Sequence, residues 1–203
     1  MNLKEKAACE ALRYVQSGMI LGLGSGSTTT YFLDMLGQRL RTGELDDILG
    51  VPTSQASAER AQAAGIPLTT LAQYPRLDLA VDGADEVDPN LCLIKGLGHA
   101  LLREKIVEIQ AEQFLVIVDE SKLVTRLGAG PLPVEIVPFG AKVHVHWLGE
   151  LSDRAELWQE PDGRPIVTDN GNYLARCWFS EGITDPYSLA RTLADRPGIV
   201  EHG

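Results

Sequence analysis

The chain has 203 residues, 44% of them hydrophobic and 23% charged, which are the proportions of an ordinary globular protein with a sizeable core. Its formal net charge of −10 argues against sequence-independent binding of nucleic acid, because such binding requires a basic surface. No stretch approaches the roughly 18 apolar residues of a membrane-spanning helix, so we expect neither a nucleic-acid nor a membrane partner.

The N-terminal segment, residues 3–16, carries apolar residues at helical spacing among charged ones, which predicts an amphipathic helix rather than a signal peptide. Lys4 lies on this helix and by itself reads as a solvated lysine. Cys9, Cys92 and Cys177 are widely spaced and form no CxxC motif, as is typical of reduced thiols rather than of disulfides or a zinc site. The expected location is therefore cytoplasmic.

A first strand is predicted at residues 19–23, and a polar loop at 24–30 connects it to a helix over 31–40. Its glycines, serine and threonine hydroxyls stand at a helix N-terminus, an arrangement that favours an anion, usually a phosphate. The dinucleotide pattern GxGxxG fails at Ser27, and the Walker pattern lacks its lysine. A phosphorylated metabolite therefore fits the loop better than a nucleotide does, although a simple helix cap with a tight turn explains it equally well.

The next elements continue an alternation of helices and strands. A strand at 48–51 ends in the hydroxyls of Thr53 and Ser54, a helix over 56–64 stops at Gly65, and 66–71 reads as a further short strand. This order is typical of a doubly wound α/β sheet.

Three predicted strands end in charged or glycine-rich residues. The runs 77–81, 91–94 and 114–118 are followed by DGADE (82–86), KGLG (95–98) and DESK (119–122), and 114–118 is the clearest buried strand of the chain. A helical pattern then opens and carries Glu104 in its second turn. Because ligands of open α/β sheets bind at the carboxyl ends of the strands, we expect one site here.

The Gly/Pro-rich residues 128–133 indicate a domain boundary, so we expect a main α/β domain at 1–128 and a small α+β domain at 129–203. The predicted elements of the second are strands near 134–137, 156–159, 166–168 and 173–179 and a final helix at 187–193. Asn170-Gly171 fits a type I′ turn. Residues 142–147 alternate like a strand but also fit a helix. We expect His144 and His146 to be surface histidines and not metal ligands.

Four residues supply the chemistry: Asp82, Asp85, Lys95 and Glu104. A phosphorylated sugar that exchanges its carbonyl and hydroxyl between C1 and C2 needs a base to carry a proton between adjacent carbons. It also needs a cation beside the enediolate oxygen and acids that open the ring. Glu104 stands opposite the apolar residues of its helix, so a solvated surface glutamate explains its position equally well.

The sequence resembles ribose-5-phosphate isomerase of the A type, in motifs that follow the family's order over nearly the whole chain. They are GLGSGSTT (22–29), DGADEVD (82–88), KGLGHALLREK (95–105), VDESK (118–122), LPVEIVPF (132–139), VTDNGN (167–172) and PGIVEHG (197–203). The resemblance implies interconversion of D-ribose 5-phosphate and D-ribulose 5-phosphate through an enediol, in the non-oxidative pentose phosphate pathway, without metal or cofactor. It also implies a Rossmann-like doubly wound main domain, a small α+β domain, and a homodimer or homotetramer.

By the same resemblance Glu104 is the proton-carrying base, Asp82 and Asp85 handle ring opening and sugar hydroxyls, and Lys95 stabilises negative charge on oxygen. The substrate-binding residues that it implies are Lys4, Ser25, Gly26, Ser27, Thr28, Gly83, Ala84, Gly96, Leu97, Gly98 and Lys122.

Two departures from the family pattern stand out. The family's loop is normally a lysine and three glycines, but Leu97 replaces the middle one. If that position needs a positive φ, we expect a lowered rate or a displaced loop. Family members usually continue past residues 201–203 with a strand that returns to the main domain, and we expect its absence to expose a sheet edge.

Two other functions compete with isomerisation of ribose 5-phosphate. An amino-sugar deaminase or isomerase could share the phosphate loop, but its histidine-centred acid/base machinery is not evident here. A non-catalytic sugar-phosphate-binding protein could keep the pocket, but it would usually carry a DNA-binding helix-turn-helix or lose the carboxylate that Glu104 supplies.

Overall fold

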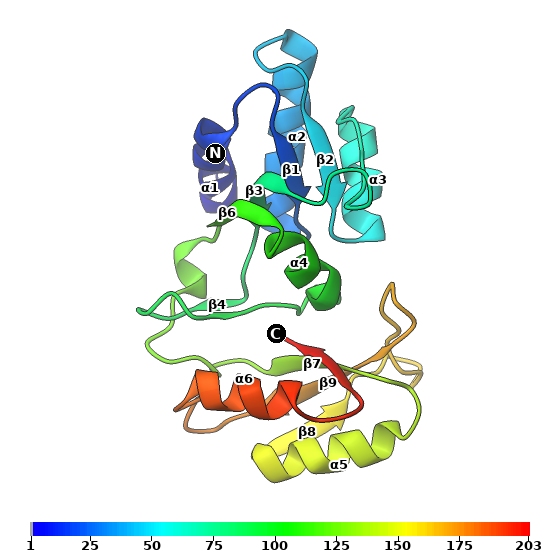
Figure 1. Ribbon diagram of the computed structural model, residues 1–203. Coiled ribbons are helices and arrows are strands. Elements are labelled where there is room, and N and C mark those ends of the chain that lie inside the picture. The colour runs from blue at the N-terminus through cyan, green and yellow to red at the C-terminus, as the bar shows by residue number, and fades with distance from the viewer. Residues whose placement is uncertain (1) are drawn as a thin grey trace. The chain divides into compact units, whose positions relative to one another are not determined.

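The computed structural model describes residues 2–203, which form two compact units (Figure 1). The first unit comprises the chain up to Gly83 together with Arg103–Ser121, and the second comprises Ala84–Leu102 and Lys122–Gly203. Each unit has its own sheet and its own hydrophobic core. Over the described residues, no helix combines the length and apolarity needed to cross a membrane.

The first unit is built on a parallel sheet with the strand order β2-β1-β3-β6. Its strands are β1 (Ile20–Leu23), β2 (Leu49–Pro52), β3 (Leu77–Asp82) and β6 (Ala111–Val116). Its helices are α1 (Leu3–Ala11), the 3₁₀ turn η1 (Leu12–Tyr14), α2 (Ser27–Thr42), α3 (Gln55–Ala64) and the part of α4 (Leu101–Glu108) from Arg103 on. The doubly wound sheet predicted from the sequence is confirmed.

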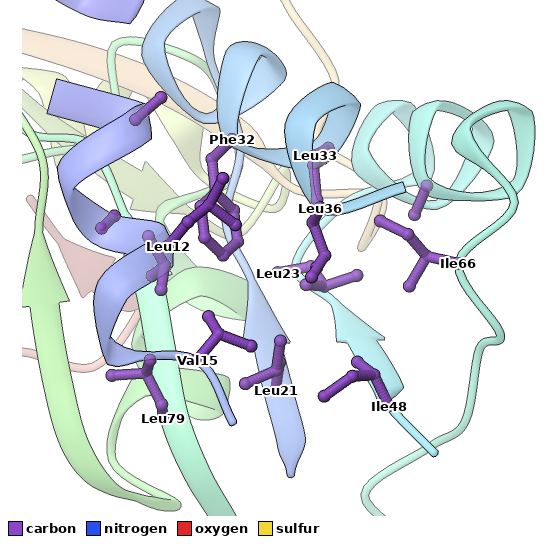
Figure 2. Close-up of a cluster of buried hydrophobic side chains, with 14 of the residues drawn as sticks. Leu12, Val15, Leu21, Leu23, Phe32, Leu33, Leu36, Ile48, Ile66 and Leu79 are labelled. Atoms are coloured by element: carbon purple, nitrogen blue, oxygen red, sulfur yellow. The ribbon is translucent and has the colours of Figure 1, made fainter. Parts of the chain in front are cut away.

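The core of this unit lies between helices and the sheet. Figure 2 shows Leu12 and Val15 from the segment between α1 and β1, Phe32 and Leu36 from α2, and Leu21 from β1. Their side chains are directed toward one another. These leucine and phenylalanine side chains are almost completely buried. The apolar residues of α1 and α2 recur at helical spacing. Each helix therefore has an apolar stripe on one side, and this stripe packs against the sheet.

A glycine in β1 sets the position of α4. A Cβ at Gly22 would lie 2.8 Å from the Val107 Cγ1 and 2.9 Å from the Ala80 Cβ, which is closer than real Cβ contacts. The helix can approach the sheet this closely only because β1 has no side chain there. This packing carries the helix that bears Glu104 to the face of β1 and β3.

The second unit is built on an antiparallel sheet with the order β10-β7-β9-β8. Its strands are β7 (Leu132–Ile136), β8 (Arg154–Leu157), β9 (Tyr173–Trp178) and β10 (Ile199–His202), with helices α5 (Ala141–Leu151) and α6 (Pro186–Ala194). A separate antiparallel pair joins β4 (Glu86–Val87) to β5 (Leu93–Ile94), and the short η2 spans Glu120–Lys122. The predicted small α+β region corresponds to most of this unit.

The boundaries of the units differ from the single cut predicted after residue 128. Residues 84–102 and 122–128 cluster with the C-terminal sheet because Ile94 and Leu127 are buried in its core. In addition, the Glu86 carboxylate accepts hydrogen bonds from the backbone N–H groups of Gly128 (2.7 Å) and Gly130 (2.5 Å). A composition change in the sequence marks the connector but does not reveal which earlier segment packs against the later sheet.

Several local predictions need correction. The run 114–118 was predicted to be the clearest buried strand, but β6 is an edge strand of the described sheet and Phe114 is 39% exposed. The predicted strand 66–71 is reduced to a bridge between Gly50 and Leu68. For residues 142–147 both a strand and a helix were considered, and the helix is correct: they belong to α5, so His144 and His146 lie on different helical faces.

The turn at 168–172 is not type I′, which requires a positive φ at both central residues. Gly171 has a φ of +79°, whereas Asn170 is not among the positive-φ residues of the described chain. Thr168 donates from its N–H to the carbonyl of Asn172 at 2.9 Å, and the Gly171 N–H donates to the Thr168 carbonyl at 2.9 Å. This is a three-residue hairpin loop with a left-handed glycine.

Candidate active site

Asp82, at the end of β3, joins that strand to the loop between β1 and α2. Its side chain is buried, and its Oδ1 accepts hydrogen bonds from the backbone N–H groups of Ser25 (3.0 Å) and Gly83 (2.7 Å). The Thr29 hydroxyl donates to the same oxygen at 3.3 Å. Gly24 permits this approach, since a Cβ there would lie 2.2 Å from the Asp82 Cγ. The predicted loop and the predicted acid are therefore one hydrogen-bonded assembly.

The first turn of α2 has the features of an anion site. The helix begins at Ser27, directly after Gly26, whose φ is +97°. Since glycine has no side chain to cap the helix, the N–H groups of this turn can donate to an anion. The Lys4 Nζ donates to the Ser27 Oγ at 2.8 Å and brings a cation to the same turn, which also contains the half-buried Thr28. Lys4, which by residue type alone would be expected to be solvated, therefore lies beside this loop.

A cluster of hydroxyls fixes the side chain of Ser25. Its Oγ lies 2.9 Å from the Thr53 Oγ1 and 2.8 Å from the Ser54 Oγ, both at the end of β2. Thr53 is buried and donates to the Leu23 carbonyl at 3.1 Å, while Ser54 caps α3 by accepting from the Ser57 N–H. Sequence reasoning noted these hydroxyls but gave them no role. Their position after a strand of the same sheet was the available signal.

Glu104 lies in the first turn of α4 and is only 4% exposed. The interpretation of this residue as a solvated surface glutamate is therefore wrong. One carboxylate oxygen each from Asp82, Glu104 and Glu108 lie within 4.8 Å of one another. Glu108 was missed in the sequence, although its spacing of four residues from Glu104 places it on the same helical face. Carboxylate oxygens at this distance can exchange a proton through a substrate, and oxygen donors of this kind can also hold a hard cation.

In the second unit, Asp85 is tied to the glycine-containing loop that follows β5. Its Oδ2 accepts a hydrogen bond from the Leu97 N–H at 2.9 Å, and its own N–H donates to the Ile94 carbonyl at 2.8 Å. Lys95 precedes this loop and donates from its backbone N–H to the carbonyl of Gly203 at 3.1 Å. Two of the predicted catalytic residues of this unit are thus connected through one short turn.

The left-handed conformations in this loop do not fall on Leu97. They fall on Gly96, with a φ of +98°, and on His99, with a φ of +70°. Leu97 therefore adds no positive-φ strain, which corrects the reason given for a lowered rate. Burial lowers the pKa of the His99 imidazole below its ordinary value, and the nearby Glu160 carboxylate opposes this shift.

The remaining predicted residues of the second unit are Ala84, Gly98 and Lys122, of which Lys122 ends η2. The predicted site residues thus divide into two groups. The first unit contains Lys4, Ser25, Gly26, Ser27, Thr28, Asp82, Gly83 and Glu104, and the second contains Ala84, Asp85, Lys95, Gly96, Leu97, Gly98 and Lys122.

Comparison with protein families gives a match to the model described as ribose 5-phosphate isomerase A (phosphoriboisomerase A), over residues 49–203. Among curated proteins, the chain is 50% identical over 201 residues to a ribose-5-phosphate isomerase A from Roseiflexus sp. (strain RS-1), covering 98% of this chain and 86% of that protein. A ribose-5-phosphate isomerase A from Thermococcus kodakarensis is 47% identical over 204 residues, covering 99% of this chain and 88% of the relative.

Solved structures of ribose-5-phosphate isomerases are also similar to this chain. A D-ribose-5-phosphate isomerase in complex with phospho-erythronic acid is 44% identical, with a TM-score of 0.95 over 100% of this chain and 90% of that one. The ribose 5-phosphate isomerase A of Methanocaldococcus jannaschii is 42% identical, with a TM-score of 0.93 over 99% of this chain and 89% of that one.

Proposed function

The chain belongs to the ribose 5-phosphate isomerase A family and is an isomerase of D-ribose 5-phosphate and D-ribulose 5-phosphate, and we propose that Glu104 is its catalytic base. The observation that supports this role most directly is the burial of the Glu104 carboxylate beside Asp82, which is itself bonded to the predicted phosphate loop. A buried carboxylate close to a second one has the position that proton transfer to a bound sugar requires.

The proposed reaction begins with the phosphate group on the first turn of α2, where Ser27, Thr28 and Lys4 supply donors. Asp82 or Asp85 then transfers the proton that opens the sugar ring. Glu104 removes the C2 proton of the open aldose, and the C1 carbonyl oxygen gains the negative charge of an enediolate. The same carboxylate returns the proton to C1. The proton of the C2 hydroxyl passes to the C1 oxygen, so that C2 becomes the ketose carbonyl and C1 carries a hydroxyl.

Lys95 is proposed to stabilise the enediolate oxygen, since a positive charge acts most strongly where negative charge develops in the transition state. The relative that binds phospho-erythronic acid supports this scheme. The carboxylate of that compound is planar and negatively charged at one end of a phosphorylated chain, as an enediolate is. Gly83, Ala84, Gly96, Leu97, Gly98 and Lys122 are proposed to contact the substrate.

The test is a coupled assay for ribulose 5-phosphate that compares the wild type with Glu104→Gln. We expect kcat to fall by at least ~10², the usual contribution of a positioned general base, with and without EDTA. Glu112→Gln is the matched control, since Glu112 is an exposed carboxylate on β6 of the same unit, and it should keep the wild-type rate. A Glu104→Gln protein with wild-type kcat would refute the proposed role.

We also propose that the protein is cytoplasmic and forms a homodimer or homotetramer. Free cysteines, of which Cys177 is buried, support a reducing compartment. Large exposed apolar side chains, such as Phe139 (91% exposed) and Tyr187 (73%), support self-association. Light scattering coupled to size exclusion would give the mass of the particle, and a monomer of 22.0 kDa would refute the oligomer.

A non-catalytic binding function is not favoured, because the base and its neighbouring acid are both present.

A further inference from the structure

His99 has a backbone conformation that is uncommon for residues other than glycine. It is one of the non-glycine residues with a positive φ in the described chain, at +70°, a region that costs free energy for any residue with a Cβ. Its N–H donates to the Gly96 carbonyl at 3.0 Å and closes the turn that follows Lys95. A glycine would adopt this conformation without strain, so the histidine side chain needs an explanation.

The side chain of His99 contacts an aromatic ring from a distant part of the chain. Its imidazole stands perpendicular to the indole of Trp158, with the ring centroids 4.5 Å apart. This is the edge-to-face arrangement that aromatic pairs prefer. The contact links the turn after Lys95 to the residue that directly follows β8.

Trp158 is itself firmly held. Its backbone N–H donates to the Leu174 carbonyl of β9 at 2.7 Å, and its backbone carbonyl accepts from the Ile166 N–H at 2.9 Å. The guanidinium of Arg176 lies 4.7 Å from its ring centroid and pairs with Glu156. Since the backbone of Trp158 is bonded on both sides and Arg176 lies against its ring, the indole can hold His99 rather than follow it.

We propose that His99 and Trp158 form a brace that positions Lys95 for the isomerisation, so that His99 is a positioning residue and Lys95 the group through which it acts. The inference rests on the proposed role of Lys95. One further hydrogen bond and one close packing contact in the loop agree with it: the Leu97 N–H donates to Asp85, and Gly96 lies so close to Leu101 that a Cβ there would be 2.6 Å from its side chain. The turn is thus fixed at its start, middle and end.

The experiment measures kcat, KM and thermal unfolding for His99→Gly and His99→Phe. The glycine variant removes both the ring and the backbone strain, so it should unfold at no lower temperature than a His99→Ala variant. Its kcat should nevertheless fall about tenfold with KM changed less than twofold, because a displaced group in the transition state costs rate more than binding. His99→Phe keeps an aromatic ring at the same φ and should recover most of kcat.

Trp158→Leu should lower kcat to the same degree, and the double variant with His99→Gly should fall no further, since both remove one contact. The control is Trp178→Leu, which removes an indole of the same sheet that also lies under an arginine, 3.8 Å from Arg154, and it should keep kcat. If Trp158→Leu does not fold, the comparison of His99→Gly with His99→Phe decides alone.

Wild-type kcat in His99→Gly, or equal losses in the glycine and phenylalanine variants, would overturn the brace. A Lys95→Ala variant in the same assay separates this failure from failure of the proposed function. If Lys95→Ala loses activity while His99→Gly does not, only the brace is wrong. If Lys95→Ala is fully active, the role of Lys95 is wrong and the brace falls with it.

Discussion

Gly24 is the residue on which the geometry of Asp82 depends. Gly24→Ala should lower kcat/KM and destabilise the protein by about 1–3 kcal/mol, the usual cost of overpacking, because the new Cβ would overlap the buried Asp82 carboxylate. Gly149→Ala is a control in which the free energy of unfolding should change in the opposite direction. Gly149 lies within α5 with open space around its Cα, so alanine should stabilise by about 0.5–1 kcal/mol. Urea unfolding and steady-state kinetics measure both, and an unimpaired Gly24→Ala would contradict the close approach.

The His99 imidazole makes the stability of the protein depend on pH. Its pKa is lowered in the folded state, mainly by burial, so the unfolded chain binds the proton more readily. The contribution of the neutral ring is complete above the unfolded pKa of about 6.5 and is lost as the pH falls toward the lower folded value. The groups around it include Glu160, which opposes the shift, and Arg176 on the same indole.

The measurement for this effect is the melting temperature of the wild type and of His99→Phe between pH 8 and pH 5. The wild type should lose more stability than the variant as the pH falls below about 6.5, since phenylalanine binds no proton. The other three histidines are common to both proteins and cancel in the difference. Parallel curves for the two proteins would show that His99 binds its proton equally well in the folded and the unfolded state.

At the scale of elements, the buried Glu135 organises the hairpin loop after residue 167. It is completely buried on β7, and its Oε1 accepts hydrogen bonds from Thr168 (2.9 Å), Asn170 (3.2 Å) and Asn172 (2.8 Å). Glu135→Ala should destabilise the protein by about 3 kcal/mol or more, since buried donors lose their acceptor and a cavity forms. Chemical denaturation measures the change.

Glu150→Ala is the matched control for this prediction. Glu150 is an exposed carboxylate on α5 that pairs only loosely with His146, at 3.6 Å, and exposed pairs contribute between zero and about 1 kcal/mol. A Glu135→Ala protein as stable as this control would show that the loop is held by its own backbone hydrogen bonds.

Much of this architecture could be predicted because apolar spacing and strand ends are local signals. The loop after β1, the acid after β3 and the helix bearing Glu104 were all located from the sequence. Burial was harder to predict, since it depends on neighbours distant in the sequence. Thus β6 was expected to be a buried strand and lies at an edge, while Glu104 fitted a surface position and is buried against Asp82.

Conformation within loops was also beyond the sequence. The glycine pattern pointed to Leu97 as the strained position, but the left-handed residues are Gly96 and His99. The reason is that a four-residue turn fixes φ through its hydrogen bonds, and only the structure shows that the His99 N–H reaches the Gly96 carbonyl. The contact of His99 with Trp158 joins residues 59 positions apart, and no local pattern indicates it.

At the scale of the whole molecule, the C-terminal part depends on an earlier segment. Residues 129–203, predicted as a domain from the connector, lack Glu86, Ile94 and Leu127, which complete the core and loop contacts of the second unit. Expressed alone, this fragment should therefore show no cooperative thermal transition, while the full chain does. Circular dichroism measures both, and a sharp transition of the fragment would show that the earlier segment is dispensable.

If the substrate phosphate binds to the first turn of α2 as proposed, the absence of a side chain at Gly26 gives the substrate a second role. A phosphate that sits on the first turn of α2 completes the helix in the way that a serine or aspartate cap does in other helices, so the ligand is in effect the missing N-cap. Any small tetrahedral anion can fill the same position. The proposed binding mode therefore predicts that phosphate or sulfate in the buffer competes with the sugar for the N-terminus of α2.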